Sequence, residues 1–220
     1  MTSNATPPER LAAGLAARIL HDISGAASGV ASGLDLLAEP GQSDMDGAAL
    51  DLAVSSAQGL LDLLAFHKVA FGASGEAVGG AALHRLALAP FEGRRPKLEW
   101  AVQIDALPAL AAQAMLILVQ IAATGLAAGG LARASADRVR GDLAIRVDGE
   151  GPRAVLQSET LEGLEGRDLS KGLAGRWAPA RYLNALVTGA GGALTATTGA
   201  GRFSLTATLA VAARVHGGVA

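Results

Sequence analysis

Hydrophobic residues recur at three- and four-residue steps along the first part of the chain, which is the period of an α-helix. The resulting stripe consists of Leu11, Leu15, Ile19, Ile23, Ala26, Val30, Leu34 and Leu37. Before it, Thr6 can cap a helix, Pro7 suits the first helical position, and Glu9 follows three residues after the cap. Glu39-Pro40-Gly41 is typical of a helix end. The pattern therefore predicts one long amphipathic helix.

A second long apolar segment follows after a short connection. Ser43-Asp44-Met45-Asp46 predicts its start, and Phe71-Gly72 predicts its end. Its apolar residues follow two lines, one with Leu52, Leu60, Leu63 and Ala70, the other with Leu50, Val54, Leu61, Leu64 and Phe71. So short a connection makes the two helices antiparallel, and one partner helix cannot cover both lines. We therefore expect a hairpin that forms a four-helix bundle with a second chain.

The pattern changes after Gly72-Ala73-Ser74-Gly75, where short β-favouring runs begin to alternate with helices. The expected elements are a helix over 80–89, a strand over 98–104, a helix over 107–128, a hairpin of 132–140 with 143–147 turning at Gly141-Asp142, a helix over 176–187, and a hairpin of 194–198 with 202–209. The sequence thus predicts an α+β protein with a helical hairpin domain over residues 1–75 and an α/β sandwich over residues 76–220.

His21 lies on the first helix, about 160° from the middle of the apolar stripe, and should face water. Its neighbours on that outer face are all small: Gly14, Ala17, Ser24, Gly25, Ser28 and Ser32. Each interior Gly costs about 1 kcal/mol of helix propensity relative to Ala. A lone exposed His is usually plain surface, but this surround favours a face that something large approaches. The other histidines, His67, His84 and His216, have no carboxylate at metal-ligand spacing, and His67 is interpreted as packing or bundle surface.

Composition narrows the classes of function. The formal charge is −2 and the pI is near 6.1, so the chain lacks the basic balance of a nucleic-acid-binding protein. The absence of cysteine excludes disulfides, thiolate nucleophiles and Cys-type zinc sites. The polar N-terminus, with two prolines, is unlike a secretory signal, and we expect a cytoplasmic protein.

One long uncharged stretch raises the question of whether the chain crosses a membrane. No charged residue lies between Asp105 and Arg133, a length that could cross a bilayer. Much of it is Ala, however, Gln113 and Gln120 share one face, and no aromatic belt flanks it. A helix packed on both sides within an α/β layer explains the stretch better.

Two segments resemble one bacterial family. His21-Asp22-Ile23-Ser24, with Gly29-Val30 and Gly33-Leu34-Asp35-Leu36-Leu37, is similar to the phosphoacceptor helix of ChpT-type histidine phosphotransferases. The segment from Ala65 to Gly72 is similar to the one that closes the second helix in that family. The chain departs from the family pattern at Ala26, where a proline is common, at Ala31-Ser32, in place of two asparagines, and at Lys68, in place of an arginine. These differences bear on partner choice more than on chemistry.

The resemblance implies a dimer shaped like a sensor histidine kinase, whose ATPase-like domain no longer binds ATP. A working ATP site of that kind needs a magnesium-holding asparagine, an Asp-x-Gly-x-Gly loop and a glycine-rich lid. The helix over 114–128 offers Gln120 and Thr124 but no asparagine. The loop Asp148-Gly149-Glu150-Gly151 has the wrong spacing, and Gly172-Leu173-Ala174-Gly175 is a weak lid. We therefore expect no ATP and no other bound cofactor, with magnesium supplied by the receiver domain of a partner.

In this interpretation His21 takes a phosphoryl group from a receiver-domain aspartate and passes it to another response regulator. Asp22 would orient its ring or accept its proton, although the side chain of Asp22 points about 100° away and is equally well plain surface. Arg18 and Lys68 would steady the phosphoryl oxygens, and Ser24, Gly25, Ser28 and Ser32 would contact the partner.

Two alternatives stay open. An active histidine kinase would label His21 with ATP alone, whereas a dimer that only binds receivers would keep its function after His21→Ala. The sequence does not choose the receivers.

Overall fold

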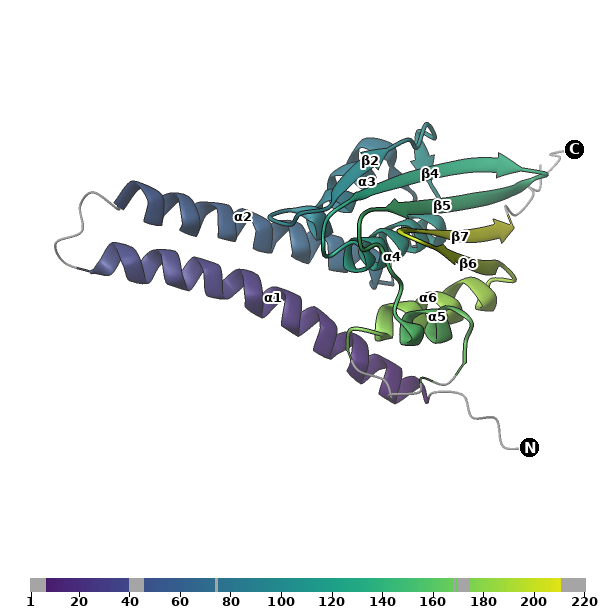
Figure 1. The fold of residues 1–220 in the computed structure, drawn as a ribbon, viewed down its shortest axis with the longest axis horizontal. Helices are drawn as coiled ribbons and strands as arrows, with labels where there is room; N and C mark the ends of the chain where they lie inside the picture. Colours follow the sequence, from purple (N-terminus) through teal and green to yellow (C-terminus); the bar gives the residue numbers. More distant parts are fainter. Residues whose placement is uncertain (1–6, 40–45, 74, 168, 170–174, 211–220) are drawn as a thin grey trace, which may run out of the picture.

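The computed structural model describes residues 7–39, 46–73, 75–167, 169 and 175–210. Two long helices, α1 (Pro8–Ala38) and α2 (Asp46–Ala70), run antiparallel and project from an α/β part (Figure 1). Pro7 precedes the first helical residue, so α1 begins one residue later than expected. Thr6 and the expected start of the second helix, Ser43 to Met45, lie outside the described residues.

Small residues let the two helices approach closely. A Cβ atom on Gly33 would lie 2.7 Å from the backbone nitrogen of Ala53, and one on Gly29 would lie 2.5 Å from the hydroxyl of Ser56. Gly33, Ala49 and Ala53 are buried in this contact. The side of α1 that meets α2 is therefore the glycine side, and the leucine stripe is turned partly away from it. Leu34 of the stripe is 54% exposed.

The α/β part contains the expected helices, together with several short elements that the sequence did not predict. The described elements after α2 are β1 (Val78–Gly79), α3 (Gly80–Leu88), the short 3₁₀ helix Ala89–Phe91, β2 (Lys97–Trp100), β3 (Ala106–Leu107), α4 (Ala109–Gly125), β4 (Leu131–Val139), β5 (Asp142–Glu150), α5 (Ser158–Leu164), α6 (Ala178–Gly189), β6 (Ala193–Gly199) and β7 (Arg202–Ala210). The strand expected over 98–104 was wrong beyond Trp100, and β1, β3, α5 and the short 3₁₀ helix were not expected. The first hairpin turns at Arg140-Gly141, one residue early, because these two residues adopt the positive φ angles that its tight turn requires.

Five strands form the main sheet in the order β2-β4-β5-β7-β6. Only the β2–β4 pair is parallel. Alternation along β5 buries Leu143, Ile145 and Val147 on the face that α4 covers, and it leaves Arg146 and Asp148 on the opposite face. The helices thus cover one face of the sheet (Figure 1).

Helix α4 accounts for the long uncharged stretch. Every residue from Ala111 to Ala123 is buried, because α4 lies between β5 on one side and α2, α3 and α6 on the others. By length and composition alone, α2 is the one described helix that could cross a membrane: its most apolar window has a mean hydropathy of 1.4 and is 17% buried. Its exposed large side chains include Leu50, Leu52, Val54, Leu61 and Leu64.

Candidate functional site

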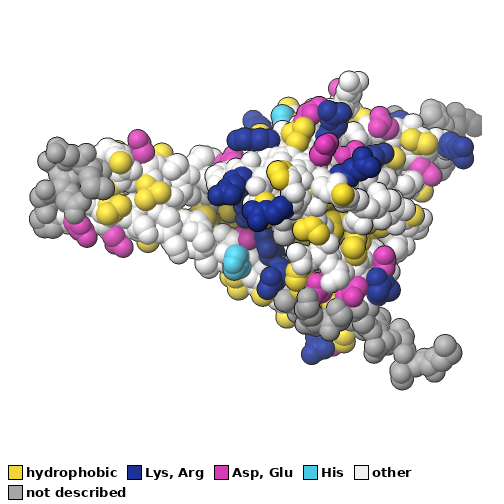
Figure 2. All heavy atoms as spheres, viewed as in Figure 1, with side chains coloured by type: hydrophobic (Ala, Val, Ile, Leu, Met, Phe, Trp, Pro, Cys, Tyr) yellow, Lys and Arg dark blue, Asp and Glu magenta, His cyan; other side chains and the backbone are white. Residues whose placement is uncertain are grey.

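His21 projects from the outer side of α1 at the level where the hairpin meets the α/β part. Its side chain is 82% exposed, which confirms the expected orientation toward water. Figure 2 shows an exposed histidine at this level, with Lys and Arg side chains beside it over the junction. An accessible imidazole next to positive charge is suited to meet an anionic group.

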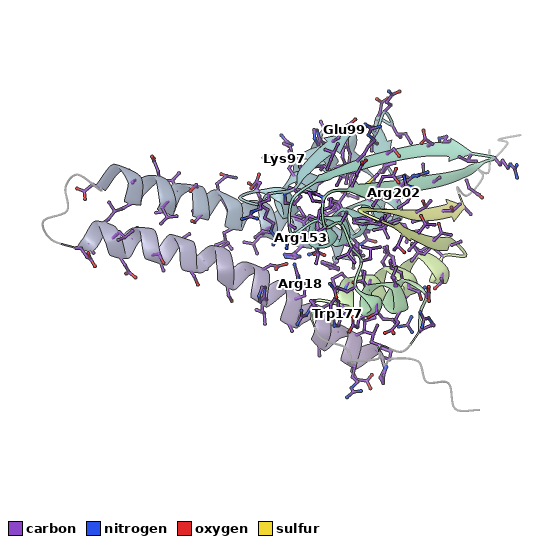
Figure 3. The ribbon with its side chains drawn as sticks, viewed as in Figure 1. Arg18, Lys97, Glu99, Arg153, Trp177 and Arg202 are labelled. Atoms are coloured by element: carbon purple, nitrogen blue, oxygen red, sulfur yellow. The ribbon has the colours of Figure 1, made fainter. Side chains whose placement is uncertain are left out.

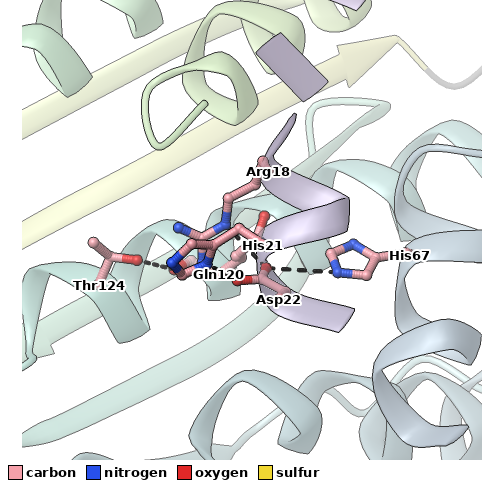
Figure 4. A network of polar contacts seen from close by, with 6 residues as sticks. All are labelled: Arg18, His21, Asp22, His67, Gln120 and Thr124. Atoms are coloured by element: carbon pink, nitrogen blue, oxygen red, sulfur yellow. Dashed lines mark hydrogen bonds and ion pairs between the residues drawn. The ribbon is translucent and has the colours of Figure 1, made fainter. Parts of the chain in front are cut away.

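Asp22 is not a surface residue, because its side chain is only 7% exposed. Three side chains converge on it (Figure 4). The Nε of Arg18 donates a hydrogen bond to Oδ2 at 2.9 Å, His21 Nδ1 lies 3.3 Å from Oδ1, and His67 Nε2 lies 3.6 Å from Oδ2. The carboxylate therefore links the exposed ring of His21 to the buried interface between α1 and α2.

The environment of Asp22 favours its ionised form. Burial by itself acts to raise the pKa of this carboxyl group, but the interactions with His67, Arg18 and His21 outweigh burial and lower the pKa below its usual 3.8. Asp22 thus stays a hydrogen-bond acceptor at neutral pH. Arg18, 13% exposed, is engaged with this carboxylate instead of standing free on the helix surface.

His67 is the residue at this site whose role the sequence analysis missed. It is 5% exposed, and its ring stacks on Phe71 at 5.7 Å and meets the edge of Phe66 at 5.4 Å. Neither ring nitrogen makes a hydrogen bond within the described part of the chain, and the carboxylate of Asp22 lies 3.6 Å from Nε2. The register of the antiparallel hairpin is the signal that could have revealed this contact. Gly29 lies against Ser56 and Gly33 against Ala53. The same register places residue 22 of α1 about one helical turn from residue 67 of α2.

The outer face of α1 beyond His21 is open. Ser24, Gly25, Ser28 and Ser32 are exposed, and a Cβ atom on Gly25 would meet nothing within 4 Å. The hydroxyl of Ser28 donates a hydrogen bond to the carbonyl of Ser24, at 2.8 Å. This small-residue face leaves room for a large partner.

Gly14 and Lys68 depart from expectation. Gly14 is buried, because its carbonyl and the nearby Arg18 backbone pack against Gly175, ahead of α6. Lys68 is exposed on α2 and makes no hydrogen bond or ion pair with described residues, so the structure does not bring it to His21 or Asp22. The expected docking face therefore starts at His21.

The described residues expected of a degenerate ATP site lie on two sides of the sheet. Asp148 lies on the open face of the sheet, where Arg146 Nε donates to it at 2.8 Å, whereas Gln120 and Thr124 line a cavity on the helix-covered side. Gly172, Leu173 and Ala174 lie outside the described residues. Within the described ranges, no group of three or more His, Asp or Glu side chains could hold a metal ion.

Residues 81–202 match the family model of the histidine phosphotransferase C-terminal domain. This match spans more than half of the chain. The chain belongs to the histidine phosphotransferase family. A search of curated protein sequences finds no match.

The chain is also similar in structure to solved proteins. A bacterial phosphotransferase solved at 1.7 Å aligns with a TM-score of 0.80 and 24% identity, over 92% of this chain and 97% of that one. The histidine kinase AdeS of Acinetobacter baumannii aligns over 89% of this chain and 96% of its own at 14% identity and a TM-score of 0.47. The histidine kinase domain of the blue-light-activated EL346 of Erythrobacter litoralis aligns over 84% of this chain and 95% of its own, at 18% identity and a TM-score of 0.47. The first alignment shows that this histidine phosphotransferase has the mixed α+β fold expected from the sequence.

Proposed function

We propose that this histidine phosphotransferase works in a phosphorelay: His21 accepts a phosphoryl group from the aspartate of one receiver domain and passes it to the aspartate of another response regulator. The observation that carries the proposal is the exposed His21 ring, held at 3.3 Å by a carboxylate that Arg18 and His67 fix from behind. The phosphotransferase family membership supports the same reaction class.

The geometry suggests how the ring is prepared. With a proton on Nδ1 that donates to Asp22, the lone pair of Nε2 is directed outward as the nucleophile. Nε2 forms the new N–P bond as the bond between phosphorus and the aspartyl oxygen breaks, and the aspartate leaves as a carboxylate. The phosphorylated ring is an imidazolium that keeps its Nδ1 proton, and the negative charge of Asp22 stabilises it. The reverse sequence delivers the group to the second receiver.

The partner supplies the rest of the site. We propose that the receiver brings its own magnesium ion, because no described cluster in this chain could hold one. Ser24, Gly25, Ser28 and Ser32 would form the docking face, since their small side chains let a receiver approach the His21 ring. Arg18 acts through Asp22 in this arrangement. Lys68 would have to reach the phosphoryl group by a change in side-chain rotamer or from across a dimer.

We also propose a homodimer through α1 and α2. Large apolar side chains of both helices are exposed by 40–63%, namely Leu20, Leu34, Leu50, Leu52, Val54, Leu61 and Leu64. A soluble monomer rarely exposes so many on one element. A second hairpin would cover them in a four-helix bundle and so account for the apolar character of α2 without a membrane. We place this dimer in the cytoplasm, with no nucleic-acid partner.

The absence of ATP binding is part of the proposal. Asp148 is held by Arg146 on the far face of the sheet, and no asparagine lies on α4. Calorimetry with magnesium and ATP should therefore give no saturable heat. Saturable micromolar binding, together with labelling of His21 by ATP alone, would instead establish the kinase alternative.

Phosphotransfer from a phosphorylated receiver tests the proposal directly. His21→Ala should abolish labelling but preserve the dimer and receiver affinity, because an exposed side chain contributes little to folding. Ser28→Arg should leave the nucleophile intact but block approach, so receiver binding and transfer rate should fall together. Thr195→Arg, an exposed position on β6, is the matched control and should change neither. Labelling of His21→Ala, or normal transfer by Ser28→Arg, would reject the assigned site or its docking face.

A further inference from the structure

Of the three side chains that converge on Asp22, His67 is the one that belongs to α2 (Figure 4). Arg18 and His21 lie on the same helix as Asp22 and move with it. Figure 3 shows Arg18 at the level where α1 passes the α/β part. His67 comes instead from the C-terminal end of the neighbouring helix, which packs against α3 and α4. The contact between His67 and Asp22 therefore connects the site on α1 to the core.

The two oxygens of the Asp22 carboxylate face different partners. Oδ1 lies 3.3 Å from Nδ1 of His21. Oδ2 accepts a hydrogen bond from Nε of Arg18 at 2.9 Å and lies 3.6 Å from Nε2 of His67. Because Arg18 and His67 both face Oδ2, they limit the rotation of the carboxylate and leave Oδ1 directed at His21. A donor beside one oxygen thus acts on the ring beside the other.

The surroundings of His67 favour one form of its ring. The side chain is buried against Phe66 and Phe71, and neither nitrogen has a hydrogen-bond partner among the described residues. A proton on Nδ1 would be buried unpaired, which is costly. A proton on Nε2 lies next to the carboxylate of Asp22, and their electrostatic attraction is strengthened because water is excluded. The site therefore favours the tautomer with the proton on Nε2.

The neighbouring elements offer His67 no comparable charged group among the described residues. Helix α4 has no charged side chain over Ala109–Gly125, and Tyr182 of α6 contacts the ring of Phe71. Lys68, next along α2, is exposed. Asp22 is therefore the group through which His67 can influence His21.

We propose that His67 is a positioning residue for phosphotransfer: with its proton on Nε2, it acts through Asp22 to keep a proton on Nδ1 of His21 and a free lone pair on Nε2 of His21. The two histidines then carry opposite tautomers on either side of one carboxylate. This inference rests on the phosphotransfer role proposed for His21, and it adds that a buried residue of α2 prepares the reactive ring on α1. Because His67 is only 5% exposed, it should affect the transfer step and not the binding of a receiver.

Substitutions of His67 separate this role from packing. His67→Phe keeps an aromatic ring beside Phe66 and Phe71 but removes Nε2. The transfer rate at saturating receiver should fall about tenfold, as for the loss of one polar contact to a charged group, and the half-saturating receiver concentration should not change. The matched control is His84→Phe, the same change in a histidine that stacks on Trp100 at 5.1 Å, and it should alter neither quantity.

Two amide variants test the position of the donor. His67→Gln places an amide nitrogen where Nε2 lies and should restore most of the transfer rate. His67→Asn places its amide nitrogen near the position of Nδ1 and should not restore it. Both introduce an amide into the same buried site, so their comparison holds even if His67→Phe fails to fold. Equal rates in the two amide variants, or a wild-type rate in a folded His67→Phe, would overturn the proposal.

Nitrogen NMR of the imidazole rings at about pH 8, where ordinary histidines are neutral, tests the tautomers without a receiver. In the wild type, His67 should carry its proton on Nε2 and His21 on Nδ1. In His67→Phe, His21 should change toward a mixture of its two tautomers. A proton on Nδ1 of His67, or a His21 ring that does not respond, would overturn the proposal. Failure of a phosphorylated receiver to label the wild type is a different outcome, because it would reject the phosphotransfer role of His21 itself.

Discussion

Helices α2 and α4 are both long and apolar, yet they lie in opposite environments. All residues from Ala111 to Ala123 of α4 are buried, whereas α2 exposes Leu50, Val54 and Leu61 by more than half. The difference lies in their neighbours: α4 has a sheet on one side and helices on the others, while α2 has α1 along its length and other elements only near its C-terminal end. Apolar composition thus indicates that the side chains of a helix must be buried against other elements. Whether elements of the same chain can bury them depends on the layers that surround the helix.

The same polar substitution in the two helices should separate these cases most strongly. Leu118→Asp would bury an unpaired charge in the centre of α4 and should prevent folding of the α/β part. Leu61→Asp should keep that part folded and convert the proposed dimer to a monomer. The fluorescence of Trp100 and Trp177, the two tryptophans of the chain, reports on the α/β part, and light scattering reports on the mass. Loss of the tryptophan signal in both variants would contradict the difference between the helices.

Substitutions at two glycines of α1 test how closely α1 and α2 pack against each other. Gly33→Ala should destabilise the protein by about 2 kcal/mol, because the new Cβ would lie 2.7 Å from the backbone of Ala53, a typical overpacking contact. Gly25→Ala, the matched control, should stabilise it by about 1 kcal/mol, because nothing lies within 4 Å and alanine favours the helix. Denaturant unfolding measures both. Equal effects would mean that the helices are not packed on the glycine side.

The C-terminal end of α2 places His67 beside the carboxylate of Asp22 on α1, and the pH dependence of this carboxylate's contribution to stability can be predicted. Because the pKa of Asp22 is lowered in the folded protein, this carboxylate stabilises the fold above its unfolded value near 3.8, and the contribution is lost as the pH falls through the folded pKa. Asp22→Asn should cost about 2 kcal/mol at neutral pH, the typical value for a hydrogen-bonded charge.

Unfolding free energies of the wild type and Asp22→Asn, measured from about pH 3 to 7, should differ by a constant amount above about pH 5 and converge below it. A difference that grows toward acid pH would contradict the ionised state assigned to Asp22.

The smallest expected effect is a change in the pKa of Tyr182, which lies near the C-terminal end of α2, where this helix enters the core. Tyr182 of α6 lies 5.6 Å from Phe71, just beyond the end of α2, and burial raises the pKa of its phenol above the usual 10.0. As the single tyrosine of the chain, it gives an unmixed ultraviolet titration. Its midpoint should fall in Phe71→Ala, which opens the site to water, and a midpoint that rises or does not move would contradict the packing.

The sequence predicted the hairpin, the exposure of His21 and most of the α/β elements, because each follows from a local period or a turn signal. It did not predict the partners of Asp22. The leucine stripe of α1 does not lie against a single neighbour, so it does not define how α1 is rotated about its own axis. For this reason the sequence was equally compatible with an exposed Asp22. The short α5 has too few residues to show a helical period, and β2 ends at Trp100 although apolar residues continue to Ile104.

The exposed side chains of α1 from Ser24 to Ser32 contribute little to the stability of the fold, whereas Gly33 on the inward side has no room for an added atom unless the backbone of α2 shifts. On the docking role proposed for the outer face, mutations that alter partner choice would be nearly free of cost to stability. Copies of such a protein within one genome could then diverge in which regulators they serve while keeping the same hairpin. The separation of the two faces would let signalling routes become insulated from one another by surface change alone.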